Sequence, residues 1–182
     1  MKEKLDGLNK TGKITNAIKE YTEKYIKDTE RNKIVLSNRN GGEFLYDVSV
    51  VNFNPKQFIK KRGKSIVIDN EETIYSSFLL LESELGGPRG SSAIGVFRNV
   101  VEDFLKLIIG NSKYKIMIMA VSKYKGEENF VKNRIDILRE IYLKSECNSD
   151  ILIIAIEGYH KRDKTQIKLD TKKMHYEILS RE

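Results

Sequence analysis

The sequence predicts a three-layer α/β protein with a mixed central β-sheet flanked by helices. Two observations lead to this prediction. Segments with apolar residues at three- and four-residue steps alternate along the chain with short segments that are apolar on both faces. Strands of the second kind belong in a sheet that is covered on both sides, and helices of the first kind supply the cover. The length of 182 residues fits a single domain, and we expect its core over about 15–157 and a C-terminal strand or extension over 158–182.

The first half of the chain is typical of a helix, a hairpin and a long strand. Apolar residues at helical spacing predict a helix over Thr15–Arg31. The turn-forming stretch NRNGGE lies between a short apolar segment, Lys33–Ser37, and an alternating one, Glu43–Phe53, which predicts a hairpin. A basic, polar stretch and a small edge strand at Ser65–Ile68 come next. A long apolar strand over Thr73–Leu85 then ends at the loop GGPRGSS.

The second half alternates helix and strand. Ser91 or Ser92 is a suitable N-cap for a helix over Ala93–Ile109, and Gly110 is a suitable C-cap. The apolar stripe of this helix predicts that it packs against a sheet. The remaining predicted elements are a strand over Lys115–Val121, a helix over Glu127–Lys144 and a strand over Asp150–Glu157.

Composition narrows the classes of partner and compartment. The chain has 33 Lys and Arg against 26 Asp and Glu, which gives a net charge of +7. This charge favours an anionic partner, nucleic acid first, although a soluble basic protein without such a partner would have the same composition. The single cysteine of the chain cannot form a disulfide within it. One cysteine and two histidines are also too few for a structural zinc site. The N-terminus lacks the apolar core of a signal peptide, and no apolar run approaches the roughly 20 residues of a membrane span. We therefore expect a cytoplasmic protein with no membrane partner.

Two carboxylates stand at the end of the long apolar strand, in FLLLESELGG. Residues two apart in a strand share a face at roughly 6.5–7 Å, so Glu82 and Glu84 can approach one ion. Asp47 interrupts the second arm of the hairpin, and we expect it to meet Glu82 where the two strands separate. Three such carboxylates are hard oxygen ligands suited to Mg²⁺ or Mn²⁺. Taken singly, each acid is equally explained as a solvated strand end or a salt-bridge partner.

The order of these elements resembles the restriction-endonuclease-like fold of the PD-(D/E)XK nuclease superfamily. In that family an Asp in a hairpin strand precedes a (D/E)-x-K motif on the next strand, followed by a helix and a further strand. Asp47 matches the hairpin Asp and Glu82 the first acid of the motif, whereas Glu84 stands at the usual Lys position. Some members with this fold use E-x-E. The resemblance covers about 15–157 in element order.

The resemblance implies a phosphodiesterase that uses Mg²⁺ or Mn²⁺ held by Asp47, Glu82 and Glu84. Glu84 would then act as ligand or general base, or Lys106 would supply the missing cation, since the catalytic Lys lies on that helix in some members. Lys106 is alternatively an ion-pair partner of Asp103 or Glu102 on its own helix. Many members carry a metal-assisting acid on the first helix, for which the candidates are Glu20, Glu23 and Glu30.

Basic residues near the active strand are candidates for binding phosphates. They precede the strand or follow it in the Gly-rich loop: Lys56, Lys60, Lys61, Arg62, Lys64 and Arg89. A solvated charge run explains them equally well. The sequence therefore predicts a metal-dependent endonuclease acting on nucleic acid, DNA in the first instance, in a restriction, repair or mobile-element system. The alternative is a catalytically inactive nucleic-acid-binding or assembly protein that keeps the fold. A homodimer is expected of an enzyme that cuts both strands.

Overall fold

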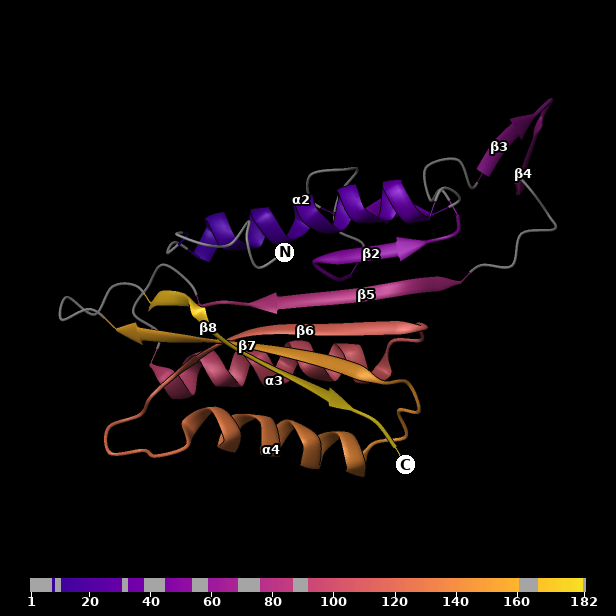
Figure 1. Cartoon of the computed structure of the whole chain (residues 1–182). Coiled ribbons are helices and arrows are strands. Elements are labelled where there is room, and N and C mark those ends of the chain that lie inside the picture. Colours follow the sequence, from indigo (N-terminus) through magenta and orange to yellow (C-terminus); the bar gives the residue numbers. More distant parts are fainter. Residues whose placement is uncertain are drawn as a thin grey trace.

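The computed structural model describes most of the chain, and in the described part three helices are arranged around one large sheet (Figure 1). The described residues are 8, 11–30, 33–37, 45–53, 59–68, 76–86, 92–160 and 167–181. The helices are α2 (Thr11–Thr29), α3 (Ala93–Ile109) and α4 (Phe130–Lys144). None of the helices in these ranges is both long and apolar enough to cross a membrane.

Six strands form the central sheet in the order β1-β2-β5-β6-β7-β8. The first three are β1 (Ile34–Leu36), β2 (Val48–Val51) and β5 (Ser77–Glu84), and the last three are β6 (Tyr114–Ser122), β7 (Ile151–His160) and β8 (Ile167–Leu179). The pairs β1–β2, β2–β5 and β7–β8 are antiparallel, whereas β5–β6 and β6–β7 are parallel. The predicted α/β class with a mixed central sheet is therefore confirmed.

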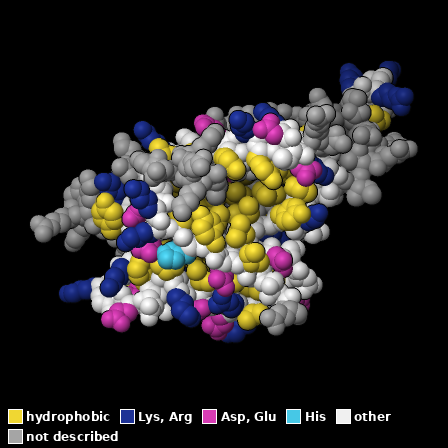
Figure 2. Space-filling model, viewed as in Figure 1, with side chains coloured by type: hydrophobic (Ala, Val, Ile, Leu, Met, Phe, Trp, Pro, Cys, Tyr) yellow, Lys and Arg dark blue, Asp and Glu magenta, His cyan; other side chains and the backbone are white. Residues whose placement is uncertain are grey.

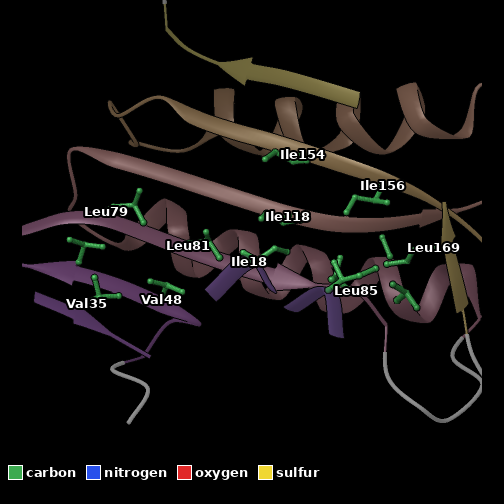
Figure 3. Close-up of a cluster of buried hydrophobic side chains, with 14 of the residues drawn as sticks. Ile18, Val35, Val48, Leu79, Leu81, Leu85, Ile118, Ile154, Ile156 and Leu169 are labelled. Atoms are coloured by element: carbon green, nitrogen blue, oxygen red, sulfur yellow. The ribbon is translucent and has the colours of Figure 1, made fainter. Parts of the chain in front are cut away.

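Helices cover both faces of this sheet, because its strands are apolar on both faces. Figure 1 shows α2 on one face and α3 with α4 on the other. On the α2 face, Ile18 packs with Val48, Leu79 and Leu81 in the cluster drawn in Figure 3. On the opposite face, Leu80 packs with the buried residues of α3 and α4. Successive residues of β5 thus serve alternate layers, which places Glu82 on the side of α3.

Several element boundaries differ from the sequence prediction. The predicted strand over Glu43–Phe53 is shorter, since β2 begins only at Val48 and Asp47 lies in a bend before it. Leu45 has a φ of 68°, which takes the chain out of the extended conformation ahead of Asp47. The turn NRNGGE lies outside the described residues, although the antiparallel pairing of β1 with β2 agrees with a hairpin. The C-terminal region that was predicted as a strand or extension contains a 13-residue strand, β8.

The basic stretch forms a separate two-stranded sheet that the sequence did not predict in full. Strand β3 (Ile59–Arg62) pairs with β4 (Ser65–Ile68), and the two meet in a turn at Gly63, whose φ is 62°. Only β4 was expected. The hairpin is inserted between the end of β2 and the beginning of β5, so it lies beyond the end of β5 opposite to Glu82 (Figure 1).

Both predicted caps of α3 are present. The side chain of Ser92 accepts a hydrogen bond from the backbone N–H of Gly95 at 3.1 Å. Gly110 ends the helix with a φ of −69°, so it is not there for a left-handed conformation. A Cβ at Gly110 would lie 2.5 Å from the hydroxyl of Tyr46 and 2.6 Å from the side chain of Leu80. Glycine therefore allows the end of α3 to approach β5 and the start of β2 closely.

Candidate functional site

Asp47 and Glu82 lie side by side at adjoining strand ends. Strands β2 and β5 are antiparallel, with Val48 opposite Leu81, so the residue before Val48 faces the residue after Leu81. The backbone N–H of Asp47 lies 3.4 Å from Glu82 Oε2 in hydrogen-bonding geometry. The structure thus brings together the two acids that the sequence expected to meet there.

The carboxylate of Asp47 contacts groups other than Glu82. Its Oδ2 accepts hydrogen bonds from the backbone N–H of Ser83 at 2.8 Å and from the Ser83 hydroxyl at 2.7 Å. Its Oδ1 lies 3.1 Å from Nζ of Lys19, a residue of α2 whose side chain is 3% exposed. The Asp47 carboxylate is therefore held between the end of β5 and the α2 layer.

Lys19 is not among the site residues predicted from the sequence. A weak signal was present, because Lys19 directly follows Ile18 and precedes Ile26 by two helical turns, which places it on the buried stripe of α2. A lysine in such a position requires an anion when it is buried. Of the first-helix acids that were considered, Glu23 accepts a hydrogen bond from Ser37 at 2.9 Å. A metal-assisting role for Glu20, Glu23 or Glu30 stays a prediction.

Glu82 is a buried carboxylate, 4% exposed. Burial first and the nearby charge of Asp103 second raise its pKa, which is about 7 although the ammonium of Lys106 lowers it. Its Oε1 lies 3.5 Å from Nζ of Lys106, yet this oxygen makes no contact with hydrogen-bonding geometry. Glu82 therefore has one oxygen facing a cation at ion-pair distance and still lacking a hydrogen-bond donor.

Glu84 lies two residues further along the same face of β5 and is half-buried. Its Oε1 accepts a hydrogen bond of 2.7 Å from the backbone N–H of Gly86, which adopts a left-handed φ of 82°. A hydrogen bond from the side chain of Asn99 also reaches Glu84. Burial is the main reason that the pKa of Glu84 is raised, and the charge of Asp103 adds to it.

Helix α3 presents a polar stripe to these glutamates. Asn99, Asp103 and Lys106 follow one another at four- and three-residue steps, so they share one side of the helix. Nζ of Lys106 lies 2.6 Å from Asp103 Oδ1 as well as 3.5 Å from Glu82 Oε1. Lys106 is therefore both a partner of Asp103 within its helix and a contact of the acidic strand. Of the two helix acids weighed for it, Asp103 is the partner at ion-pair distance.

Sequence reasoning missed Asn99 and did not place Asp103 beside the glutamates. The sequence signal that could have found them is their position along the helix. Each of the three polar residues directly precedes a buried residue of the apolar stripe of α3, namely Val100, Phe104 and Leu107. A polar stripe beside the apolar one must lie at the margin of the sheet contact, where it can reach a strand end.

Tyr46 connects the two halves of the site. Its hydroxyl donates a hydrogen bond of 3.1 Å to the backbone carbonyl of Lys106, and burial followed by the charge of Glu82 raises the pKa of Tyr46. The last turn of α3 is thereby tied to the start of β2. This hydrogen bond fixes the position of the Lys106 backbone relative to β2, and with it the point at which the Lys106 side chain leaves the helix.

The predicted phosphate-binding residues lie apart from the acids. Lys61, Arg62 and Lys64 are exposed on the β3–β4 hairpin, where Figure 2 shows dark-blue side chains. Lys60 belongs to β3. Lys56 and Arg89 lie outside the described residues. The hairpin and the acidic cluster are thus at opposite ends of β5.

The site is a carboxylate cluster with two ammonium groups, Lys19 and Lys106, at the ends of β2 and β5, in a three-layer α/β protein. Within the part of the chain that the structure describes, no three Asp, Glu, His or Cys side chains are close enough together to bind a metal jointly as they stand. No family model, curated protein or solved structure matches this chain. The function is therefore inferred from the residues of the site themselves.

Proposed function

We propose that this chain is a metal-dependent endonuclease that hydrolyses phosphodiester bonds of DNA. The observation that carries the proposal is Glu82. It is a buried carboxylate with an oxygen that lacks a hydrogen-bond donor, and it lies beside Asp47 and Lys106 at the ends of two strands. A buried, incompletely paired carboxylate costs several kcal/mol unless it is protonated or binds a cation.

The residues present fit a divalent cation by their chemistry. Glu82, Glu84 and Asp47 provide hard carboxylate oxygens, which Mg²⁺ and Mn²⁺ prefer over nitrogen or sulfur. The oxygen of Glu82 that lacks a hydrogen-bond donor is the first ligand in this proposal. When bound, the ion would polarise the scissile phosphate and lower the pKa of a water molecule.

The residues of the chain have separate roles in this proposal. Glu82 binds the cation, and Asp47, whose carboxylate contacts Ser83 and Lys19 on the α2 side, holds the strand end in place. Lys106, whose side chain is 48% exposed, extends from α3 towards solvent and is placed to contact the charge of a phosphate. Glu84 is the candidate general base, because it lies on the same face of β5 as Glu82 and burial raises its pKa above the ordinary value.

Two further features support this proposal. The order α2, β1, β2, β5, α3 and β6, with β5 parallel to β6, agrees with the element order of the PD-(D/E)XK resemblance. The net charge of +7 and the exposed cations of the β3–β4 hairpin suit a polyanion. A homodimer, which would present two sites to the two strands, is part of the proposal.

A second candidate function is a catalytically inactive nucleic-acid-binding or assembly protein. The observation that favours it is the pairing of Asp47, whose carboxylate has both Lys19 and Ser83 as partners. A carboxylate with its charge compensated in this way has less need of a metal. The usual Lys of the family motif is also replaced by Glu84.

Cleavage assays with matched variants distinguish the two candidates. We expect the purified chain to nick supercoiled plasmid DNA with Mg²⁺ or Mn²⁺, and Glu82→Gln to abolish this activity. Glu102→Gln is the control, because it removes the same charge from an exposed position of α3. If DNA and RNA both stay intact with either metal while the chain still binds DNA, the inactive protein becomes the better description.

A further inference from the structure

Lys106 lies between two carboxylates that come from different elements. Its ammonium is 2.6 Å from Asp103 Oδ1, on α3, and 3.5 Å from Glu82 Oε1, on β5. It is therefore at the point where a cation shared by the helix and the strand would lie. Because the Glu82 oxygen has no hydrogen bond, the ammonium compensates its charge only partly.

We propose that Asp103 is a metal ligand together with Glu82, and that Lys106 is a resident cation which leaves both carboxylates when a divalent ion binds. The inference rests on the proposed function in that it concerns the same site. It adds Asp103, which neither the motif nor the family resemblance indicates. It also gives Lys106 a role in the metal-free protein, where its ammonium pairs with both carboxylates.

The exposures of the three side chains show which of them can move. The side chain of Lys106 is 48% exposed, that of Asp103 20% and that of Glu82 5%. Lys106 can swing into water at the cost of a partly exposed ion pair with Asp103 and of its charge compensation of the buried Glu82, which the divalent ion then supplies. Glu82 cannot leave without unfolding the strand end, so it stays as the fixed ligand.

Charge favours the exchange. Asp103 and Glu82 both lie within ion-pair distance of the Lys106 ammonium. Asp47 differs because Lys19 compensates it on the α2 side. The acids facing α3 therefore share the single charge of Lys106 where a divalent ion would offer two. The divalent ion would then bind between the carboxylates of Glu82 and Asp103, in the space that the Lys106 ammonium leaves.

The release of Lys106 from the carboxylates makes its ammonium available to contact a phosphate. A lysine that leaves the acids enters solvent at the mouth of the site, where a phosphate would approach. Metal binding and phosphate contact are then coupled through one side chain. By reciprocity, a phosphate that holds Lys106 away would strengthen metal binding.

Amine acylation of the wild-type chain, followed by mass spectrometry, tests the displacement. We expect saturating Mn²⁺ to raise the labelling rate of Lys106 severalfold, because its ammonium loses two carboxylate partners. Lys132 is the internal control, since it forms an exposed ion pair with Asp136 away from the acids. Unchanged labelling of Lys106 while Mn²⁺ is bound would overturn the displacement.

Calorimetric titration with Mn²⁺ tests the ligand. We expect Asp103→Asn to weaken binding at least about tenfold, Glu102→Gln to leave it unchanged, and Lys106→Met to tighten it about fivefold, the size of an exposed ion pair. Equal binding by the Asp103→Asn and Glu102→Gln variants would remove Asp103 from the ligand set.

The results also separate this inference from the nuclease proposal. Mn²⁺ binding that displaces Lys106 without any cleavage would leave the metal site standing and refute the nuclease. Metal-dependent cleavage that survives Asp103→Asn with unchanged Mn²⁺ affinity would support the nuclease and refute Asp103 as a ligand. A wild-type chain that binds no Mn²⁺ at millimolar concentration would refute both.

Discussion

The backbone N–H of Asp47 points at the carboxylate of Glu82, 3.4 Å away, while the carboxylate of Asp47 turns to Lys19 and Ser83. The two acids are therefore neighbours whose negative groups belong to different layers. Glu82 faces Lys106 and the α3 layer, and Asp47 is neutralised from the α2 layer. This division gives the two acids different expected responses to mutation.

Glu82 should make the stability of the metal-free protein depend on pH. Its pKa is about 7 in the folded protein against an ordinary value of 4.5, so between these values the folded state holds a proton that the unfolded state releases. The free energy of unfolding is then highest below about pH 4.5 and falls by about 3 kcal/mol as the pH rises through 7. Urea denaturation at pH 5 and pH 8 with a chelator measures this difference.

Glu82→Gln is the matched variant for this experiment, because it keeps the shape and removes the titration. We expect it to be more stable than the wild type at pH 8 and to lose most of the pH dependence. A wild type and variant that vary in parallel between pH 5 and 8 would show that Glu82 has an ordinary pKa.

Asp47→Asn should destabilise the fold even without metal. The change removes the Asp47 carboxylate from its ion pair with Lys19, whose side chain is 3% exposed, and breaking a buried ion pair costs about 3 kcal/mol. The double variant Lys19→Met/Asp47→Asn should recover most of this loss, since it removes the buried charge as well. Denaturation midpoints of the three proteins measure the coupling. A double variant no more stable than Asp47→Asn would contradict a structural pairing of these residues.

Gly110→Ala should disturb the end of α3 that carries Lys106. The new Cβ would meet the Tyr46 hydroxyl at 2.5 Å and the Leu80 side chain at 2.6 Å, so one of them must shift. We expect a loss of about 1–3 kcal/mol in unfolding free energy, as for other overpacked sites. Gly12→Ala is the control, because nothing lies within 4 Å of a Cβ at that helical position and the change should stabilise slightly. Equal melting temperatures for both variants would refute the close approach.

The β3–β4 hairpin should contribute to the salt dependence of DNA binding. Lys61, Arg62 and Lys64 are exposed there, and each phosphate contact that is lost makes the log–log slope of affinity against salt shallower by about 0.9. Replacing all three by Gln should reduce the slope by about 2–3, measured by fluorescence anisotropy. The same replacement at Lys123, Lys125 and Lys172, exposed residues outside the hairpin, should leave the slope unchanged. Identical slopes for the two triple variants would make the hairpin a solvated surface.

Much of the architecture could be predicted from local patterns. The periodicity of α3, its cap at Ser92 and its end at Gly110 are all in the sequence, and the structure confirms them. The apolar strands around it predicted a sheet covered on both faces, which is present. The nearness of Asp47 and Glu82 followed from antiparallel pairing, since each stands at the end of its strand.

The partners of those acids could not be predicted in the same way. Lys19 looks like any lysine of an amphipathic helix, and it is buried only because α2 lies over the strand end where Asp47 provides an anion. Asp103 looks like a partner of Lys106 within its helix until α3 packs against β5 and both approach Glu82. The β3–β4 pairing could not be predicted either, because three of the four residues of β3 are charged and conceal the alternation of a strand. The sequence by itself determined the elements and their order, because backbone conformation and amphipathic faces depend on residues a few positions apart. Only the tertiary structure decided which charge faces which, because the energy of a charge depends on its burial and on neighbours that packing brings from distant parts of the chain.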